Sequence, residues 1–183
     1  MLRKVVFLDR DGVINQNSPN FIKSWSEFHF ISRSIDALRD LTNGGLTIIV
    51  ITNQSAVSRK LISIKELEHI HTKMKDVIES KGGKIRDIFV CPHLPSDGCA
   101  CRKPSPGLIY QAQSIYDIDL ALSVMIGDSV GDIQCGFNAG CGRSILVRTG
   151  NGKDAENILT EAGTATDYIA KDLYDAAQWL LHQ

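Results

Sequence analysis

Short apolar segments with little polar alternation constrain the fold of this chain more than any other feature. The first is Val5 to Leu8, and residues 46–51 and 124–127 form two more. Such a run is typical of a strand buried on both faces, as in a parallel sheet covered by helices. Further strands are predicted at residues 85–90, 145–147 and 168–170. Because helical patterns separate the strands, the sequence predicts an α/β fold with a doubly wound, Rossmann-like parallel sheet.

The helices are predicted from apolar residues at helical spacing. They begin near Ser34, Ser63 and Pro106, and two more span residues 131–139 and 173–181. Residues 148–167 form a variable stretch without a predicted element. A length of 183 residues suits one well-buried domain, so a single domain over residues 1–183 is expected. Within it, the polar segment at about 15–29 is expected to form a flap over the ligand crevice.

Bulk composition limits the partners of the chain. The formal net charge is -1 and Lys and Arg form no dense block, which argues against nucleic-acid binding and against a basic membrane patch. Residues 1–4 lead directly into the first apolar run without a secretory pattern, and the sequence contains no apolar stretch of membrane-spanning length. We therefore expect a cytoplasmic monomer that acts on a small polar molecule.

Two carboxylates follow the first predicted strand, in the sequence Asp9-Arg10-Asp11-Gly12. Ligands of open α/β sheets bind outside the carboxyl ends of the strands, so both acids are expected at the crevice. Acids this close repel each other and need a shared cation or proton, which suits a Mg²⁺ site or an acid/base pair. The alternative is an ordinary polar turn, since Asp and Gly are common turn residues.

Other strand ends carry residues that suit a phosphate. Thr52 to Ser55 follow the second strand, Asp128 follows the strand at 124–127, and Lys103 is the best candidate for a positive side chain. Each has a simpler explanation: a turn at Thr52, a helix N-cap at Asp128, or a solvated charge at Lys103. Together they favour a phosphate site with a hard cation.

With these motifs in order, the chain resembles the haloacid-dehalogenase (HAD) superfamily of phosphatases. The matching motifs are Asp9-Arg10-Asp11-Gly12, Thr52-Asn53, Lys103 and Gly127-Asp128-Ser129-Val130-Gly131-Asp132. The resemblance implies a HAD-like fold, here without a separate cap domain, and a reaction in which Asp9 attacks phosphorus and forms an aspartyl-phosphate. Asp11 would be the general acid and then the base.

The same resemblance implies the remaining catalytic positions. Mg²⁺ would be held by Asp9, Asp128 and the backbone carbonyl of Asp11, and Thr52 and Lys103 would hold the phosphoryl oxygens. Asp132 also fits the last motif, either behind the metal ligands or on the helix surface.

Three thiols and an imidazole lie within residues 91–101, at Cys91, His93, Cys99 and Cys101. Four such ligands without an open position indicate a structural tetrahedral Zn²⁺ site. The alternative is a set of buried free cysteines and a surface histidine. Cys135 and Cys141, which lie outside this loop, are expected to be packing residues. Because Cys101 directly precedes Arg102 and Lys103, an ordered zinc loop is expected to position both.

The zinc loop narrows the resemblance to the branch of heptose bisphosphate 7-phosphatases and histidinol-phosphate phosphatases. The sugar bisphosphate is favoured, which implies removal of a 7-phosphate on the route to the nucleotide-heptose precursors of lipopolysaccharide. Histidinol phosphate is the alternative substrate, and a non-catalytic zinc-stabilised binding module is the alternative of another class. Ser129 departs from the lysine common in the heptose enzymes. The branch implies these substrate contacts: Asn17, Ser18, Pro19, Asn20, Asn53, Gln54, Ser55 and Arg102.

Overall fold

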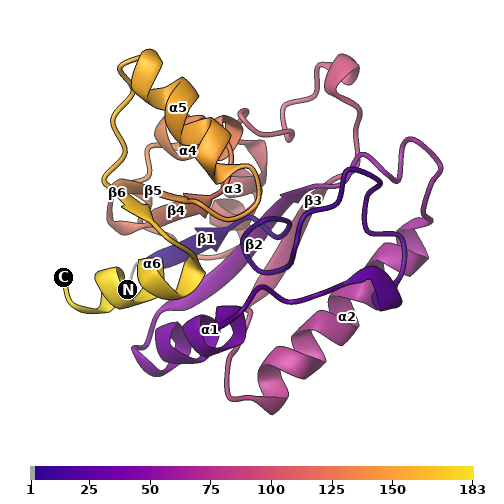
Figure 1. Cartoon of the computed structure of the whole chain (residues 1–183), viewed down its shortest axis with the longest axis horizontal. Coiled ribbons are helices and arrows are strands. Elements are labelled where there is room, and N and C mark those ends of the chain that lie inside the picture. Colours follow the sequence, from indigo (N-terminus) through magenta and orange to yellow (C-terminus); the bar gives the residue numbers. More distant parts are fainter. Residues whose placement is uncertain (1–2) are drawn as a thin grey trace.

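The computed structural model describes residues 3–183, so Met1 and Leu2 of the N-terminal segment considered above lie outside the described residues. Its centre is a six-stranded parallel sheet with the order β3-β2-β1-β4-β5-β6 (Figure 1). The strands are β1 (Val5–Leu8), β2 (Thr47–Asn53), β3 (Asp87–Cys91), β4 (Val124–Gly127), β5 (Arg143–Val147) and β6 (Tyr168–Ala170). The predicted doubly wound parallel sheet is confirmed.

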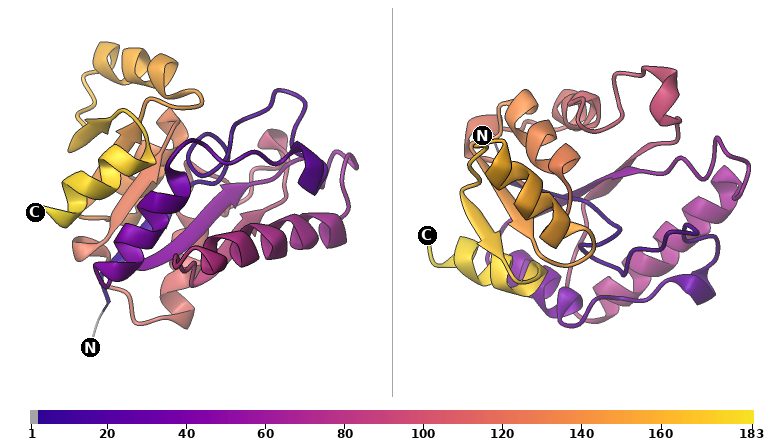
Figure 2. Two further views of the ribbon diagram at one scale, coloured as in Figure 1. Left: turned by 60° about the horizontal axis from the view of Figure 1, so that its bottom comes forward. Right: turned by 45° about the horizontal axis from the view of Figure 1, so that its top comes forward.

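Six α-helices cover the two faces of the sheet in the residues described (Figure 2). They are α1 (Ser34–Asn43), α2 (Ile64–Ser80), α3 (Gly107–Ile115), α4 (Val130–Ala139), α5 (Gly152–Glu161) and α6 (Leu173–Leu181), with short 3-10 helices at Trp25–Glu27, Pro95–Asp97 and Leu120–Leu122. Alternate residues of β1 face the two helix layers on either side of the sheet. Val6 and Leu8 pack with α1, α2 and α6, whereas Val5 and Phe7 pack with α3 and α4. The absence of polar alternation in β1 reflects this burial on both sides.

The order of the strands reverses between β1 and β4. The chain builds β1, β2 and β3 outward in one direction and then returns to place β4 on the other side of β1. A crevice forms outside the carboxyl ends of the strands at such a switch point. Asp9 and Asp128 follow the two strands that flank it, and the Asp9 backbone N–H donates to the Ile126 carbonyl at 3.0 Å. The topology therefore places the two predicted metal ligands next to each other.

One element differs from the sequence prediction. Residues 148–167, predicted as a variable stretch, contain α5 (Gly152–Glu161), which packs Ala155 and Leu159 against β5 and α4. Its first residue is a glycine and its apolar stripe is narrow, so the usual helix signals are weak. The predicted third strand is also shifted, since it begins at Asp87 and ends at Cys91.

The segment between β1 and α1 contains the predicted flap and is drawn in indigo in Figure 1. It is fixed to the Asp9-Arg10-Asp11-Gly12 motif, because Asn15 forms an isolated bridge with Asp11 and another with Phe30. Trp25, Phe28 and Phe30 form an aromatic cluster, with the Trp25 and Phe28 rings stacked at 5.0 Å. No helix within residues 3–183 is both long and apolar enough to cross a bilayer.

Candidate active site

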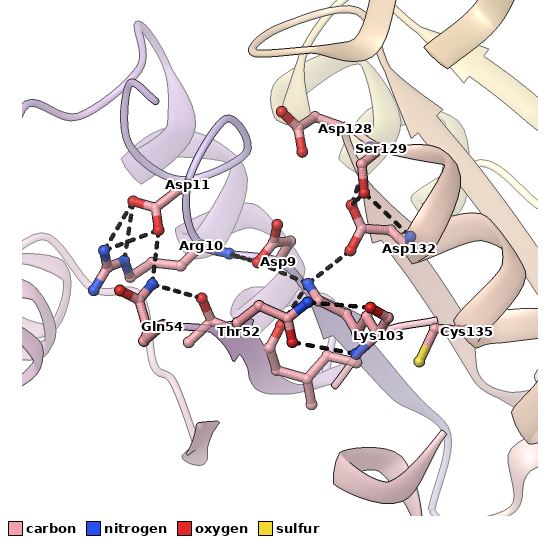
Figure 3. Close-up of polar contacts among 12 residues, drawn as sticks. Asp9, Arg10, Asp11, Thr52, Gln54, Lys103, Asp128, Ser129, Asp132 and Cys135 are labelled. Carbon is pink, nitrogen blue, oxygen red and sulfur yellow. Dashed lines mark hydrogen bonds and ion pairs between the residues drawn. The ribbon is translucent and has the colours of Figure 1, made fainter. Parts of the chain in front are cut away.

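Three carboxylates meet at the carboxyl ends of β1 and β4 (Figure 3). Asp9, Asp128 and Asp132 each bring an oxygen to within 4.8 Å of the others. Burial and the neighbouring acids raise the pKa of Asp128, and burial raises that of Asp9 against the opposing effect of Lys103. Crowded, desolvated carboxylates of this kind are stabilised by a cation with oxygen preference.

The side chain of Lys103 supplies one positive charge to this cluster. Its ammonium group is buried and contacts Asp9 Oδ1 at 2.8 Å, Asp132 Oδ1 at 2.6 Å and the Ile51 carbonyl at 3.0 Å. Burial alone lowers the pKa of a lysine, but the two carboxylates outweigh it and raise the pKa of Lys103 above its ordinary value. Lys103 is therefore a fixed cation beside Asp9, and its contact with phosphoryl oxygens stays a prediction.

Asp132 lies inside the protein and not on the helix surface. It is fully buried, and its Oδ2 accepts hydrogen bonds from the Ser129 backbone N–H at 3.0 Å and from the Ser129 hydroxyl at 2.6 Å. Ser129 is the N-cap of α4 and forms a capping box with Asp132. With these oxygens used by Ser129 and Lys103, Asp9 and Asp128 offer the free oxygens for a divalent cation.

The loop after β5 orients Asp128, a role that was not predicted from the sequence. Asp128 Oδ2 accepts from the Asn151 backbone N–H at 2.8 Å and from its side-chain amide at 3.3 Å. The Thr149 hydroxyl donates to the Gly12 carbonyl at 2.6 Å, which ties the loop to the first motif. A Cβ added at Gly12 or Gly150 would lie about 2 Å from Asp128 Oδ2, so both positions require glycine.

Asp11 is held apart from the three clustered acids by a separate network (Figure 3). Arg10 donates to both of its oxygens at 2.8 and 2.9 Å, Asn15 donates at 2.8 Å and Gln54 at 2.7 Å. Burial raises the pKa of Asp11, but the Arg10 charge and these hydrogen bonds outweigh it and lower the pKa below its ordinary value. The second acid of the motif is thus held mainly as the carboxylate, and its side chain does not join the cluster of Asp9, Asp128 and Asp132.

The residues predicted at the end of the second strand either support other side chains of the site or line its cavity. Thr52 is buried, and its hydroxyl accepts from Gln54 Nε2 at 2.9 Å. The Asn53 side chain brackets the backbone of Lys103, accepting from its N–H at 3.2 Å and donating to its carbonyl at 3.3 Å. Asn53 therefore connects β2 to the segment that carries the lysine.

A cavity of about 270 Å³ opens above these groups. Of the predicted substrate contacts, Pro19 and Asn20 line neighbouring hollows instead. Among the described residues lining the 270 Å³ cavity, Arg102 is the one cationic side chain. The cavity is lined by Asp9, Asp11, Asn17, Ser18, Phe21, Ile22, Asn53, Gln54, Ser55, Arg102, Asp128, Ser129 and Asn151.

The four predicted zinc ligands come together beside β3. The Cys101 sulfur lies 3.1 Å from that of Cys91 and 3.6 Å from that of Cys99, and His93 Nδ1 lies 3.2 Å from Cys101. A tetrahedral ion with Zn–S bonds of about 2.3 Å separates its sulfurs by about 3.8 Å, close to this arrangement. Arg102 Nη1 donates to the His93 carbonyl at 3.3 Å, so the cluster also supports the cavity wall.

Comparisons with known proteins agree with this geometry. A family model described as HAD-hydrolase-like matches residues 100–176. The chain is 42% identical to a D-glycero-beta-D-manno-heptose-1,7-bisphosphate 7-phosphatase of Bordetella bronchiseptica over 98% of this chain and 99% of that protein. It is 34% identical to the corresponding phosphatase of Escherichia coli, over 97% and 94% of the two chains.

Solved structures give the same result. The crystal structure of the D,D-heptose 1,7-bisphosphate phosphatase of B. bronchiseptica, complexed with magnesium and phosphate, is similar with a TM-score of 0.91 and 41% identity over 98% of each chain. The phosphatase of the same name from Burkholderia thailandensis is similar with a TM-score of 0.75 and 30% identity, covering 99% of this chain and all of that one.

Proposed function

Because this chain belongs to the D-glycero-D-manno-heptose-1,7-bisphosphate 7-phosphatase family of HAD hydrolases, we propose that it removes the 7-phosphate of that sugar bisphosphate. The HAD-like fold follows from the same comparisons. The observation that carries the substrate assignment is one cavity that combines the carboxylate cluster with the lone cation Arg102. The cluster suits one phosphate with its metal, and Arg102 suits the second phosphate, since guanidinium pairs well with phosphate oxygens.

In the first step, an oxygen of Asp9 attacks phosphorus and forms an aspartyl-phosphate while the bond to the sugar oxygen breaks. Asp11 gives a proton to the departing sugar oxygen from its protonated form, which the lowered pKa makes the minor form at neutral pH, so that an alcohol leaves. Lys103 contacts Asp9 at 2.8 Å and so lies where negative charge accumulates on the transferring group. We assign Thr52 to the phosphoryl oxygens from its place in the second motif, and its hydroxyl accepts from Gln54, which also donates to Asp11.

In the second step, Asp11 takes a proton from water, the water oxygen attacks phosphorus, and the bond to Asp9 breaks to release phosphate. Mg²⁺ fits the donor set of Asp9, Asp128 and the Asp11 backbone carbonyl, and when bound it would neutralise charge on the transferring phosphoryl group. The structure in complex with magnesium and phosphate supports this cofactor for the family. The buried, mutually repelling carboxylates support it in this chain.

The loop of Cys91, His93, Cys99 and Cys101 is proposed to bind structural Zn²⁺. Its four ligand atoms lie within 4.8 Å of one another, all five cysteines of the chain are free thiols, and the ligand types leave no open position for chemistry. Metal analysis of the purified protein tests this directly, with one zinc ion per chain expected. That the enzyme works as a cytoplasmic monomer stays a prediction.

Two rate measurements test the proposed reaction. Hydrolysis of an aryl phosphate with and without Mg²⁺ should require both the metal and Asp9, and Asp9→Asn should be inactive. Activity of Asp9→Asn equal to that of an active wild type would contradict the role of Asp9 as the nucleophile, whereas no hydrolysis by the wild type with Mg²⁺ would favour a binding module. The specificity constants for heptose 1,7-bisphosphate and histidinol phosphate are then compared side by side, and a clear preference for histidinol phosphate would overturn the substrate assignment.

A further inference from the structure

The middle residue of the first motif, Arg10, points away from the ligand cavity into the protein. It is fully buried, whereas an arginine at a strand end is usually solvated. Its Nε and Nη2 donate to Asp11 in a forked contact of 2.8 to 3.2 Å, and its guanidinium lies 5.9 Å from the centre of the Phe28 ring. The orientation of Asp11 therefore depends on where this guanidinium is held.

The remaining guanidinium nitrogen contacts a histidine from a different element. Arg10 Nη1 lies 2.9 Å from Nε2 of His71, which is only 8% exposed on α2. An arginine has no acceptor, so Nε2 must be the unprotonated nitrogen and accept the hydrogen bond. Burial and the Arg10 charge favour this neutral form, since together they lower the pKa of His71 to about 3.

We infer that His71 is a positioning residue for the general acid: by accepting from Arg10 Nη1, it fixes the guanidinium that orients the Asp11 carboxylate. The inference rests on the proposed acid/base role of Asp11. Without an acceptor at this position, a buried N–H would lose its partner, and the fork could turn to find another. Asp11 would stay paired with the Arg10 charge, but its carboxylate would no longer be oriented toward the leaving-group oxygen. No other role in the proposed reaction requires a buried histidine on α2.

This role has a consequence that simple loss of packing does not share. A sugar oxygen leaves poorly unless it receives a proton, whereas nitrophenolate leaves readily without one. Because kcat/KM reports the steps up to the departure of the leaving group, a misdirected acid lowers kcat/KM for the sugar phosphate and spares that for nitrophenyl phosphate. Damage to the metal site or to the nucleophile lowers both.

The test compares His71→Leu, which removes the acceptor, with His71→Gln, whose side-chain carbonyl can accept from Arg10. Met74→Leu is the matched control, because Met74 is fully buried on the same helix and its side chain has no polar contact to lose. General acids contribute about 10²- to 10⁴-fold, so His71→Leu is expected to lower kcat/KM for heptose bisphosphate by at least about tenfold. The value for nitrophenyl phosphate should change less than about threefold, and His71→Gln should restore most of the loss.

Asp11→Asn separates this inference from the function on which it rests. If Asp11→Asn lowers kcat/KM for both substrates equally, the acid role of Asp11 fails and the proposed function must change. The other result is that Asp11→Asn lowers kcat/KM for the sugar phosphate alone. If a folded His71→Leu then has the kcat/KM values of the wild type or of Met74→Leu, the role of His71 is wrong. If His71→Leu does not fold, His71→Gln decides: near wild-type selectivity supports the inference, and a loss equal on both substrates refutes it.

Discussion

Replacing Lys103 with methionine should destabilise the folded protein substantially. The substitution keeps most of the side-chain volume but removes the ammonium group from between Asp9 and Asp132, which it contacts at 2.8 and 2.6 Å. The lysine side chain is 3% exposed and that of Asp132 is fully buried, so water cannot replace the lost cation. The remaining carboxylates would then repel one another in a desolvated site.

Removing one partner of a buried ion pair costs about 3–5 kcal/mol of unfolding free energy. For a chain of this size, each kcal/mol lowers the melting temperature by about 2–4 °C, so a decrease of roughly 10 °C is expected at pH 7.5 without Mg²⁺. The raised pKa of Lys103 means that its stabilisation is fully present at this pH, below the unfolded value of 10.5. Adding Mg²⁺ at about 100 times its Kd should recover about 2–3 kcal/mol.

The assay is thermal unfolding of the wild type and Lys103→Met at pH 7.5 and pH 5, with and without Mg²⁺. The raised pKa values of Asp9 and Asp128 predict that acid neutralises these groups in the folded protein, so the difference between the two proteins should narrow at pH 5. Lys23→Met is the matched control, because water and salt screen its solvent-accessible pair with Glu27, which therefore contributes little to stability. A melting temperature of Lys103→Met equal to that of Lys23→Met would refute the buried-cluster reasoning.

Other predictions concern the two metal sites. Gly150→Ala should weaken Mg²⁺ binding at least about tenfold by calorimetry, because the new Cβ would meet Asp128 and the residue has a φ of +57° that L side chains rarely adopt; unchanged affinity would count against this contact. Cys99→Ser should lose the zinc ion and lower turnover several-fold, because the loop then no longer positions Arg102 and Lys103. The control Cys141→Ser should keep the zinc. Full turnover of a zinc-free Cys99→Ser would contradict this link between the zinc loop and the active site. Mg²⁺ affinity should fall as pH decreases from 8 to 6, because protons on Asp9 and Asp128 compete with the ion.

Much of the site could be predicted because it lies directly after apolar strands. Asp9, Thr52 and Asp128 each follow a run of buried residues, and parallel strands bring such positions to one edge. The zinc ligands were predictable for a different reason, since they lie within one short loop. The strand pattern was sufficient in the first case, and local spacing in the second.

Other parts depend on contacts between distant segments. The sequence allowed Asp132 to lie either behind the predicted metal ligands or on the helix surface, and its buried contact with Lys103 depends on a distant loop. Asn151 precedes a helix with weak signals, and its contact with Asp128 requires the loop to fold back over Gly12. Arg10 lies inside a recognised motif, but its direction is set by His71, 61 positions later in the chain.

The central claim is that Asp9 carries the phosphoryl group between two in-line displacements. It is tested most directly by the stereochemical course at phosphorus, using a sugar phosphate made chiral with oxygen isotopes and hydrolysed in isotopically labelled water. Each in-line displacement inverts the configuration, so transfer to Asp9 and then to water predicts overall retention. Overall inversion would mean that water attacks the substrate directly and would contradict the proposed role of Asp9.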